Sequence, residues 1–489
     1  MSLEPDNNMK VELNIEKKYF FAILSSVIIL AAVFGVYAYG TNTPSVFGHS
    51  AGELAITLSN GSVTSLQNAI TNNYIGGGGG AGSTNVYNIG NISGNVFIKQ
   101  VSFGIYSICL LFVDGKVACA GYQTGGQLGI GPGGTSADLF QLLPISGVKS
   151  LTTMGSYNHC AVMQDGSAKC WGYNPVGQVG VGTNNYGGYN GYSSIYYPTT
   201  VIDSGVVDIS ITVAAYYDHS CAVKTDGTVW CWGYNGYGQL GVGDTTQRTT
   251  PTQVSGLSSV SAITTASGSY VSPYCALKTD GTVWCWGYNG YGQLGVGDVT
   301  QRNSPTKVNY IGSSGGGSLP KATKIFIGSP GSTSGGDTVC ALLEDQSLAC
   351  WGYNGQGAVG DGTFTDKPNP VRVLTNVKDF VIAGWGTTGE TTCAVKTDGT
   401  VWCWGYNGYH QIPTQKAGVE YYVNLNVPAQ IIGLTNATSI YAGGWSASYN
   451  ICAVLNDLSV RCWGYNGYGQ LGVGHASTYS YPAKPIINF

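Results

Sequence analysis

The chain has 489 residues, of which 75 are glycine, 34 are tyrosine and 14 are cysteine, and its formal net charge is −4. This composition excludes a basic nucleic-acid binder, because little positive charge is available to meet phosphates. An aromatic content of 12% excludes a hydrophobe-poor disordered chain, and the glycine content disfavours long helices. A large β protein remains, in which the 14 cysteines need an explanation.

An unbroken apolar stretch of 21 residues runs from Tyr19 to Tyr39. At about 1.5 Å per residue it matches the roughly 30 Å hydrocarbon core of a bilayer, so we expect a transmembrane helix over residues 19–39. Three lysines precede the stretch, and no Lys or Arg follows it before Lys99. This asymmetry predicts a single-pass membrane protein with residues 1–18 in the cytoplasm and the rest outside the cell.

Two other interpretations of the apolar stretch remain open. A cleaved signal peptide would use Val36 and Ala38 as small-residue cleavage positions. Its usual apolar core spans about 7–15 residues, so the length of this one favours an uncleaved anchor. A pilin-like leader would need a glutamate just inside the apolar run, which this chain lacks. All three interpretations export the remainder of the chain.

Residues 40–94 are predicted to form an extracellular spacer. Residues 55–58 predict a short strand, and residues 62–70 predict two helical turns. Five consecutive glycines, Gly76 to Gly80, lack the Gly-Lys-Ser/Thr ending of a phosphate-binding loop. They therefore predict a flexible linker between the membrane and the domain that follows.

An internal repeat fills the rest of the chain, about residues 95–489. The segment Asp226–Asp244 recurs unchanged at Asp280–Asp298, and shorter copies make seven units in all. Successive units are 51, 61, 54, 65, 53 and 59 residues apart, whereas the two cysteines within each unit are always ten positions apart. A rigid unit with connections of variable length is typical of a repeat protein. The cysteine pairs are Cys109/Cys119, Cys160/Cys170, Cys221/Cys231, Cys275/Cys285, Cys340/Cys350, Cys393/Cys403 and Cys452/Cys462.

Each unit predicts a β-hairpin. In Cys221–Trp232, two short apolar runs flank Thr225, Asp226 and Gly227, which are typical of a turn. Counting outward from the turn brings Cys221 opposite Cys231 at a non-hydrogen-bonded pair, where Cα atoms lie about 4.5 Å apart, close enough for a disulfide. We therefore expect seven disulfides within hairpins, formed in an oxidising compartment. Zinc sites pair cysteines more closely, so we expect neither a metal nor a cofactor.

The repeat resembles that of the regulator-of-chromosome-condensation family. The resemblance lies in the W-G-x-N-x-x-G-Q-L-G-x-G runs Trp232–Gly243 and Trp286–Gly297, followed by Pro-x-x-V at Pro251–Val254 and Pro305–Val308. Seven such repeats imply an all-β, seven-bladed β-propeller. Such a ring buries both faces of each sheet, which a single four-stranded sheet cannot do alone. We expect residues 481–489 to complete a blade together with residues 96–101.

The resemblance implies a scaffold rather than an activity. Nuclear members of the family act on a small GTPase and bind chromatin, whereas this chain is predicted to be anchored, exported and rich in disulfides. Exchange activity is therefore not carried over. A secreted relative that inhibits β-lactamases is closer in compartment, and it implies that the scaffold can bind proteins outside the cell.

The sequence shows no catalytic constellation. His159 and His219 stand next to the first cysteine of their repeats, where a hydrogen-bonded structural histidine is the simpler interpretation. His410 replaces a corner glycine, so we expect that corner to differ locally. Asp361 and Asp366 lack the spacing of a calcium loop. We therefore expect the protein not to be an enzyme.

Tyrosine-rich insertions are the predicted binding elements. Tyrosine supplies large contact area at small entropic cost and is common on recognition surfaces. Insertions at residues 184–197, 310–323 and 410–426 interrupt the otherwise regular repeat, whereas the recurring YNGYG corners are interpreted as packing between blades. The candidate ligand-loop residues are Tyr186, Tyr189, Tyr192, Tyr196, Tyr421 and Tyr422.

Taken together, the sequence predicts a cell-surface binding or adhesion module that presents a disulfide-stapled propeller. Its expected partners are the membrane, through the N-terminal helix, and an extracellular protein or glycan, but no nucleic acid. The alternatives are a secreted or anchored protein inhibitor, a structural surface-coat protein and, last in rank, an enzyme.

Overall fold

The computed structural model describes residues 55–57, 63–65, 98–104, 107–132, 136–152, 157–182, 194–212, 218–266, 271–309, 321–328, 336–384, 389–408, 410–413, 423–443, 450–457, 459–465 and 479–480. Within these ranges no helix is long and apolar enough to cross a membrane. The predicted anchor at residues 19–39 and the tail at residues 1–18 lie outside the described residues.

Seven four-stranded antiparallel sheets make up the body of the described chain, and each is built from four consecutive strands. The first sheet contains β3 (Ile98–Gly104), β4 (Ser107–Phe112), β5 (Val117–Tyr122) and β6 (Ser136–Leu142). The second contains β7 (Val148–Thr152), β8 (Asn158–Met163), β9 (Ala168–Tyr173) and β10 (Ser194–Ile202). The third contains β11 (Val206–Ile211), β12 (His219–Lys224), β13 (Val229–Gly233) and β14 (Arg248–Gln253).

The remaining four sheets follow the same plan. The fourth contains β15 (Val260–Thr265), β16 (Tyr274–Lys278), β17 (Val283–Gly287) and β18 (Arg302–Lys307). The fifth contains β19 (Ala322–Ile327), β20 (Thr338–Leu343), β21 (Leu348–Gly352) and β22 (Lys367–Leu374). The sixth contains β23 (Val377–Gly384), β24 (Glu390–Lys396), β25 (Val401–Gly405) and β26 (Leu425–Gln430). The seventh contains β27 (Ala437–Gly443), β28 (Asn450–Leu455), β29 (Val460–Tyr465) and β30 (Tyr479–Ser480).

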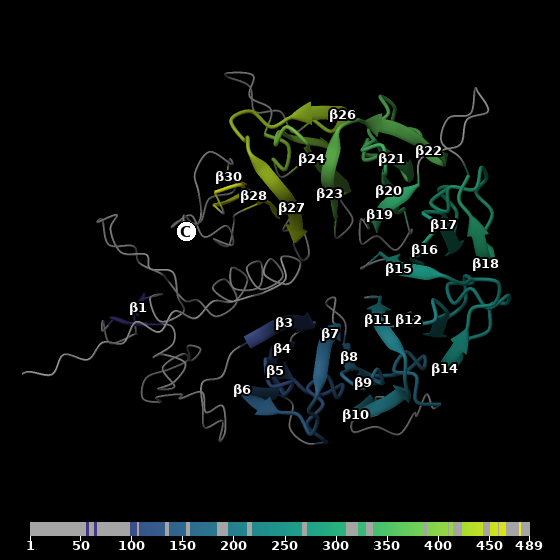
Figure 1. Ribbon diagram of the computed structural model, residues 1–489, viewed down its shortest axis with the longest axis vertical. Helices are drawn as coiled ribbons and strands as arrows, with labels where there is room; N and C mark the ends of the chain where they lie inside the picture. Colours follow the sequence, from purple (N-terminus) through teal and green to yellow (C-terminus); the bar gives the residue numbers. More distant parts are fainter. Residues whose placement is uncertain are drawn as a thin grey trace, which may run out of the picture.

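The sheets are the blades of a propeller. Figure 1 shows them arranged around a common centre, with first strands such as β15 and β23 toward the centre and fourth strands such as β14 and β22 at the outside. Neighbouring first strands contact one another from blade to blade. This arrangement confirms the predicted all-β propeller with seven sheets.

The hairpin predicted from the cysteine spacing forms in every blade. Cys221 lies opposite Cys231 and Val223 opposite Val229, as counted from the turn. The paired cysteine Cα atoms lie 4.0–4.1 Å apart. This separation is slightly shorter than the expected value of about 4.5 Å for a non-hydrogen-bonded pair.

All fourteen cysteines are in described residues, and each pairs with the other cysteine of its own hairpin. The first cysteine of each pair lies in the second strand of the blade, and the second cysteine lies in the third strand. The seven disulfides are Cys109–Cys119, Cys160–Cys170, Cys221–Cys231, Cys275–Cys285, Cys340–Cys350, Cys393–Cys403 and Cys452–Cys462. Each bridge therefore ties the two middle strands of one blade together.

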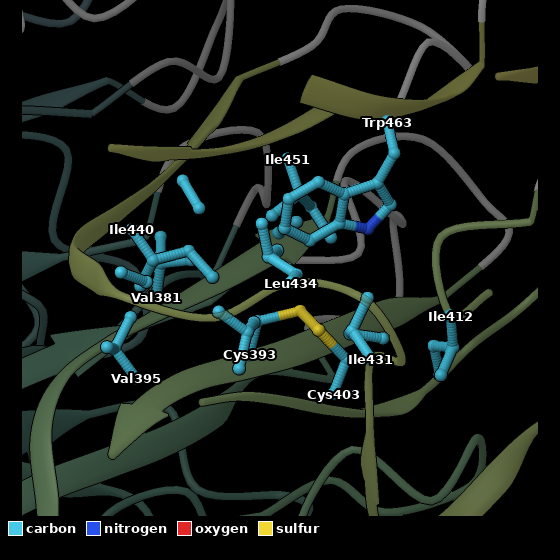
Figure 2. Packing of buried hydrophobic residues seen from close by; sticks show 14 of the residues in the cluster. Val381, Cys393, Val395, Cys403, Ile412, Ile431, Leu434, Ile440, Ile451 and Trp463 are labelled. Atoms are coloured by element: carbon cyan, nitrogen blue, oxygen red, sulfur yellow. A yellow bond between two sulfur atoms is a disulfide. The ribbon is translucent and has the colours of Figure 1, made fainter. Parts of the chain in front are cut away.

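The hydrophobic core is divided into clusters that lie between adjacent blades. Figure 2 shows the cluster between the sixth and seventh blades, where the Cys393–Cys403 disulfide and Ile431 of one blade pack against Ile440 and Trp463 of the next. All of these residues are buried. Removing this apolar surface from water is the main favourable term that holds the blades together.

Two sequence-based expectations are wrong in detail. Residues 62–70 were expected to be helical, but β2 (Val63–Ser65) is a strand that pairs with β1 (Ala55–Thr57). The β-branched residues Val63 and Thr64 favour this extended pairing. Residues 96–101 were expected to share a blade with residues 481–489, which lie outside the described residues. Instead β3 pairs with β4 in the first sheet, whose four strands all come from residues 98–142.

Candidate functional site

The ring has two faces, which we define by the ends of the strands. A turn that contains an aspartate, such as the Asp226-Gly227 turn between β12 and β13, lies at one end of every hairpin, and these turns form the turn face. The corners that follow the third strands, with the sequence YNGYG in the third and fourth blades, lie at the opposite end and form the corner face. The chain leaves β9 and enters β10 at the corner face, where Ser194 pairs with Tyr173, and residues 184–193 of the predicted insertion lie outside the described residues.

Each corner is held by its own amide side chains. In the third blade, Asn235 Oδ1 accepts a hydrogen bond from Leu240 N at 2.9 Å, and Asn235 Nδ2 donates to the carbonyl of Asp244 at 2.9 Å. Gln239 Oε1 accepts from Tyr237 N at 2.8 Å. Buried backbone groups are costly when unsatisfied, so these bonds fix the corner in one conformation.

A buried tryptophan joins each corner to the following blade. Trp286 Nε1 donates to the carbonyl of Gln239 at 2.8 Å, and Gly241, with φ near +69°, packs directly against the indole. The described residues contain six such bonds, at 2.8–3.1 Å, made by Trp171, Trp232, Trp286, Trp351, Trp404 and Trp463. The first blade has Ala120 at this position and so has no indole to donate.

The sixth corner keeps this geometry despite its histidine. His410 takes the place of the corner glycine and adopts the left-handed φ of 58°. Its backbone N donates to the Asn407 carbonyl at 3.2 Å, and Ile412 N still donates to Asn407 Oδ1 at 2.8 Å. The expected local difference is therefore confined to a less favourable backbone conformation, which the surrounding bonds maintain.

A chain of tyrosine rings runs across the corner face, and we call Tyr234, Tyr237, Tyr288, Tyr291 and Tyr353 the tyrosine belt. Within a corner, the ring centroids of Tyr234 and Tyr237 lie 6.4 Å apart, as do those of Tyr288 and Tyr291. Between corners, Tyr237 meets Tyr288 at 5.6 Å and Tyr291 meets Tyr353 at 5.3 Å, both edge to face. The belt therefore links the third, fourth and fifth blades without interruption.

The belt is accessible to solvent and is stiffened by packing. Tyr237 is 36% exposed, and the other four rings are half-buried. Two residues beyond Tyr234, Gly236 leaves room for the phenol to lie across the turn, because a Cβ there would collide with its ring. Gly290 does the same for Tyr288. Ordered aromatic rings of this kind lose little conformational entropy when a partner binds.

Acidic groups lie close to the belt. Burial raises the pKa of the Tyr288 hydroxyl, and neighbouring tyrosines and Asp337 raise it further. Burial also raises the pKa of the Tyr353 hydroxyl, and the charge of the nearby Asp366 raises it further. Glu390 is fully buried, and that burial raises its pKa well above the usual value although Thr338 N donates to its carboxyl group at 3.1 Å.

In the third, fourth and fifth corners, each described cation is paired with a neighbouring acid. Arg248 pairs with Asp244 at 2.6 Å, and Arg302 pairs with Asp298 at the same distance. Lys367 pairs with Asp361, also at 2.6 Å. Asp361, one of the two aspartates considered above as calcium ligands, is therefore held in an ion pair. No group of three or more His, Cys, Asp or Glu side chains suited to a metal ion lies among the described residues.

The cysteines belong to the scaffold and contribute nothing to a binding surface. Cys119 lies in β5, Cys170 in β9 and Cys350 in β21, and all three are fully buried. These cysteines are therefore core residues. Cys119 packs in the cluster between the first two blades, and Cys170 packs in the cluster between the second and third blades. Cys350 packs in the same way between the fifth and sixth blades. A ligand at the surface of the ring cannot reach these disulfides, so the candidate site must be built from other residues.

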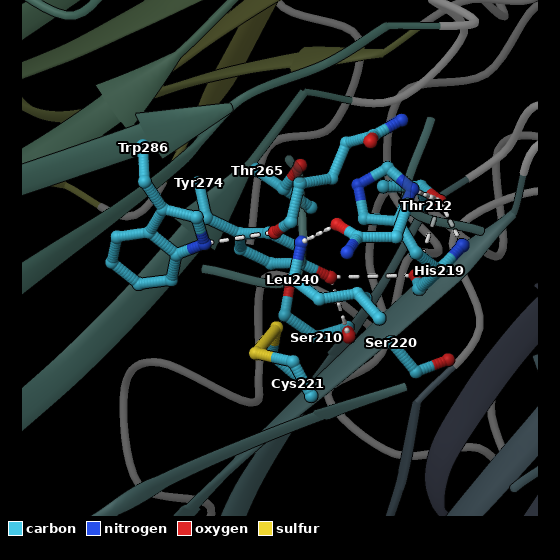
Figure 3. Close-up of a disulfide and its surroundings, with 12 residues drawn as sticks. Ser210, Thr212, His219, Ser220, Cys221, Leu240, Thr265, Tyr274 and Trp286 are labelled. Carbon is cyan, nitrogen blue, oxygen red and sulfur yellow. Dashed lines mark hydrogen bonds between the residues drawn. A yellow bond between two sulfur atoms is a disulfide. The ribbon is translucent and has the colours of Figure 1, made fainter. Parts of the chain in front are cut away.

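The two histidines beside the cysteines are part of the scaffold. His159 is fully buried, stacks on Trp171 with ring centroids 5.6 Å apart, and lies 3.1 Å from Ser107 Oγ. Burial lowers its pKa to about 3, so the ring is neutral. Figure 3 shows His219 beside Thr212, whose Oγ1 accepts from the His219 backbone N at 2.9 Å.

The predicted ligand-loop residues are only partly described. Tyr186, Tyr189, Tyr192, Tyr421 and Tyr422 lie outside the described residues. Tyr196 lies in β10 and is half-buried, and its hydroxyl donates to the Thr124 carbonyl of the preceding blade at 3.5 Å. Its backbone carbonyl accepts from Gly131 N at 3.0 Å. These contacts give Tyr196 a role in joining the first two blades.

The YNGYG corners were expected to pack between blades, and the contacts of Tyr237 with Tyr288 and of Tyr291 with Tyr353 agree with this expectation. The partial exposure of the same rings, which makes them a continuous track on the surface, was not expected. The signal was available in the sequence: tyrosines three positions apart recur at the same place in neighbouring units, and a ring brings such positions side by side.

Comparison with known proteins agrees with this fold. Two models of the regulator of chromosome condensation (RCC1) repeat match the chain, one at residues 226–272 and 280–332 and the other at residues 148–178, 211–239 and 387–411. The matched residues fall mainly in the second, third, fourth and sixth blades and cover less than half of the chain, so over these blades the chain is similar to proteins with RCC1 repeats. The first, fifth and seventh blades have the same hairpin.

Individual relatives cover the repeats to different extents. The ultraviolet-B receptor UVR8 of Arabidopsis thaliana is 27% identical over 385 residues, which are 77% of this chain and 79% of that protein. The E3 ubiquitin-protein ligase HERC2 of Homo sapiens is 28% identical over 321 residues, which are 64% of this chain but only 6% of the ligase. The crystal structure of human WBSCR16 matches with a TM-score of 0.50 at 21% identity, covering 76% of this chain and 94% of that one. At this identity the structural likeness shows the fold alone.

Proposed function

We propose that the protein is a binding module that a single-pass anchor presents outside the cell, where its propeller holds a partner protein. The observation that carries this proposal is the pairing of all fourteen cysteines into disulfides, one in each blade. Such a set forms and persists in oxidising compartments, which include the cell exterior. The apolar stretch at residues 19–39 supplies the anchor in this proposal, and residues 40–94 the spacer.

A propeller of this kind suits binding because its frame is rigid and its loops vary. The bond from Trp286 to Gln239 and its five counterparts fix each blade to its neighbour. Loops on such a frame can change in sequence without disturbing the core, and recognition residues are commonly placed there. The belt lies on the corner face, and the chain also leaves β9 and enters β10 at that face, which favours the corner face as the binding surface.

The test is the accessibility of the full chain on intact cells. The protein is expressed with one tag at the N-terminus and another at the C-terminus, and the cells are treated with a protease that cannot enter them. We expect cleavage within the glycine-rich spacer, release of the C-terminal tag and retention of the N-terminal tag. Protection of the C-terminal tag, with cleavage restored only after lysis, would overturn the proposed topology.

A further inference from the structure

We propose that the tyrosine belt binds an extended, basic segment of a partner protein, with arginine or lysine side chains lying against the tyrosine rings. This inference rests on the proposed function, because it names the surface and the chemistry of the partner. It goes beyond the insertions considered in the sequence analysis, since the belt belongs to the repeated corners themselves.

The arrangement of the rings provides the first argument. Five rings follow one another at 5.3–6.4 Å across three blades, so they form a track rather than an isolated pocket. A track suits an extended chain that offers the same kind of side chain at intervals. Cationic side chains are attracted to the faces of aromatic rings, and guanidinium groups also stack on them.

The charge of the face provides the second argument. Leaving aside the buried Asp218, Asp337 and Glu390, residues 233–248, 287–302 and 352–367 carry four aspartates and three cations. The three cations are Arg248, Arg302 and Lys367, and each pairs with an aspartate of its own corner. Asp366 is the aspartate of this set that lies outside the three ion pairs, and the excess of negative charge that it leaves favours a cationic occupant over an acidic one.

The field also separates a basic polypeptide from a glycan. A neutral glycan would gain contact with the rings, but the excess of carboxylates would contribute nothing to its attraction. The phenol groups of Tyr288 and Tyr353 hold their protons more firmly, with a raised pKa, because of burial and nearby acids, so the belt itself adds no negative charge. A cation therefore meets neutral rings backed by carboxylates, which is a favourable combination.

The experiment measures binding of fluorescent synthetic peptides to the full chain in detergent. One peptide alternates arginine with serine, and matched peptides replace arginine by glutamate or glycine. We expect the arginine peptide to bind, the other two not to bind, and added salt to weaken the complex. The double variant Tyr237→Ser with Tyr291→Ser should lose roughly tenfold in affinity, as expected for removal of aromatic contacts.

Matched variants keep the test independent of folding. Tyr197 is 52% exposed in β10 of the second blade, outside the belt, so Tyr197→Ser makes the same chemical change and should leave binding unaltered. Tyr237→Phe keeps the ring and should bind the arginine peptide as the unaltered protein does, whereas Tyr237→Ser should bind it more weakly, though less weakly than the double variant. Thermal unfolding of each variant confirms that the ring is intact.

Three outcomes would overturn the proposal. They are equal binding of the arginine peptide to the double variant, equal binding of the glutamate peptide, and binding of a neutral oligosaccharide in place of the basic peptide. The two proposals can fail separately. Release of the C-terminal tag from intact cells without peptide binding refutes the belt assignment alone, whereas peptide binding by a protected propeller refutes the topology alone.

Discussion

Trp286 of the fourth blade donates its indole N–H to the carbonyl of Gln239, at the corner of the third blade, over 2.8 Å. Trp286 is fully buried, so this bond is shielded from water at the junction between two blades. The equivalent bond recurs at the other described junctions, which makes it the unit by which one repeat recognises the next.

Replacing Trp286 with phenylalanine should test this bond. The variant keeps an aromatic ring but leaves the buried Gln239 carbonyl without its donor, so the free energy of unfolding should fall by about 1–3 kcal/mol. Thermal or denaturant unfolding under non-reducing conditions measures the change. The control is Trp284→Phe, because Trp284 is half-buried and donates only to the Thr282 hydroxyl. Equal losses in the two variants would contradict the account.

A substitution at Gly241 should test how closely the corner of the third blade approaches the indole of Trp286. Its φ of +69° disfavours any side chain, and a Cβ would lie 2.8 Å from Trp286 ring atoms. Gly256 has a similar φ of +74° with nothing within 4 Å of its Cβ position. Gly256→Ala should therefore lose only about 1 kcal/mol for the backbone conformation. Gly241→Ala should lose about 1–3 kcal/mol more for the collision, and a difference near zero would show that the indole can move aside.

The sequence predicted the repeat, the hairpin register and the disulfide pairing because all three follow from short-range spacing. Cys221 faces Cys231 through counting alone. The partner of Trp286 could not be obtained in this way, because Gln239 lies 47 residues earlier and the contact depends on how blades pack. The tyrosine belt was missed for the same reason, since Tyr237 meets Tyr288 only when two corners lie side by side.

The expected blade shared between the two ends of the chain shows another limit. Residues 481–489 resemble the fourth strand of a repeat, but a sequence pattern does not say which edge a strand will join. The structure pairs β30 with β29 and keeps β3 in the first sheet, so every blade with four described strands is continuous in sequence.

Glu390 should make stability depend on pH. Its burial raises the folded-state pKa above the usual value of 4.5, so the folded protein retains this proton more firmly than the unfolded chain. The resulting stability is fully present below the unfolded pKa and is lost as the pH rises through the folded pKa. Glu390→Gln cannot ionise, so it should be less sensitive to pH over that window, as measured by denaturant unfolding at several pH values.

A matched substitution controls for the loss of one glutamate. Glu344 is exposed on the turn face, so Glu344→Gln should leave the pH dependence as it is in the unaltered protein. A pH profile of Glu390→Gln that coincides with that of the unaltered protein would show that Glu390 does not titrate as its burial predicts.

The disulfides should differ in their resistance to reduction. Twelve of the cysteines are fully buried, whereas Cys452 of the seventh blade is half-buried. Limited treatment of the folded protein with reductant, followed by alkylation and mass spectrometry, should modify Cys452 and Cys462 before any other pair. Earlier modification of an interior pair such as Cys275 and Cys285 would contradict the burial seen here. Each bridge should contribute just under about 3 kcal/mol in the chain-entropy model.

The most direct measurement of the central claim is the cysteine pairing of the full chain purified from cells without reductant. The claim is that this is an exported propeller stapled once in each blade. Free thiols are blocked at lysis, and peptides are mapped by mass spectrometry before and after reduction. The account predicts seven links, each between cysteines ten positions apart, and no blocked thiol. Blocked thiols at most of the pairs, or links between different blades, would contradict it.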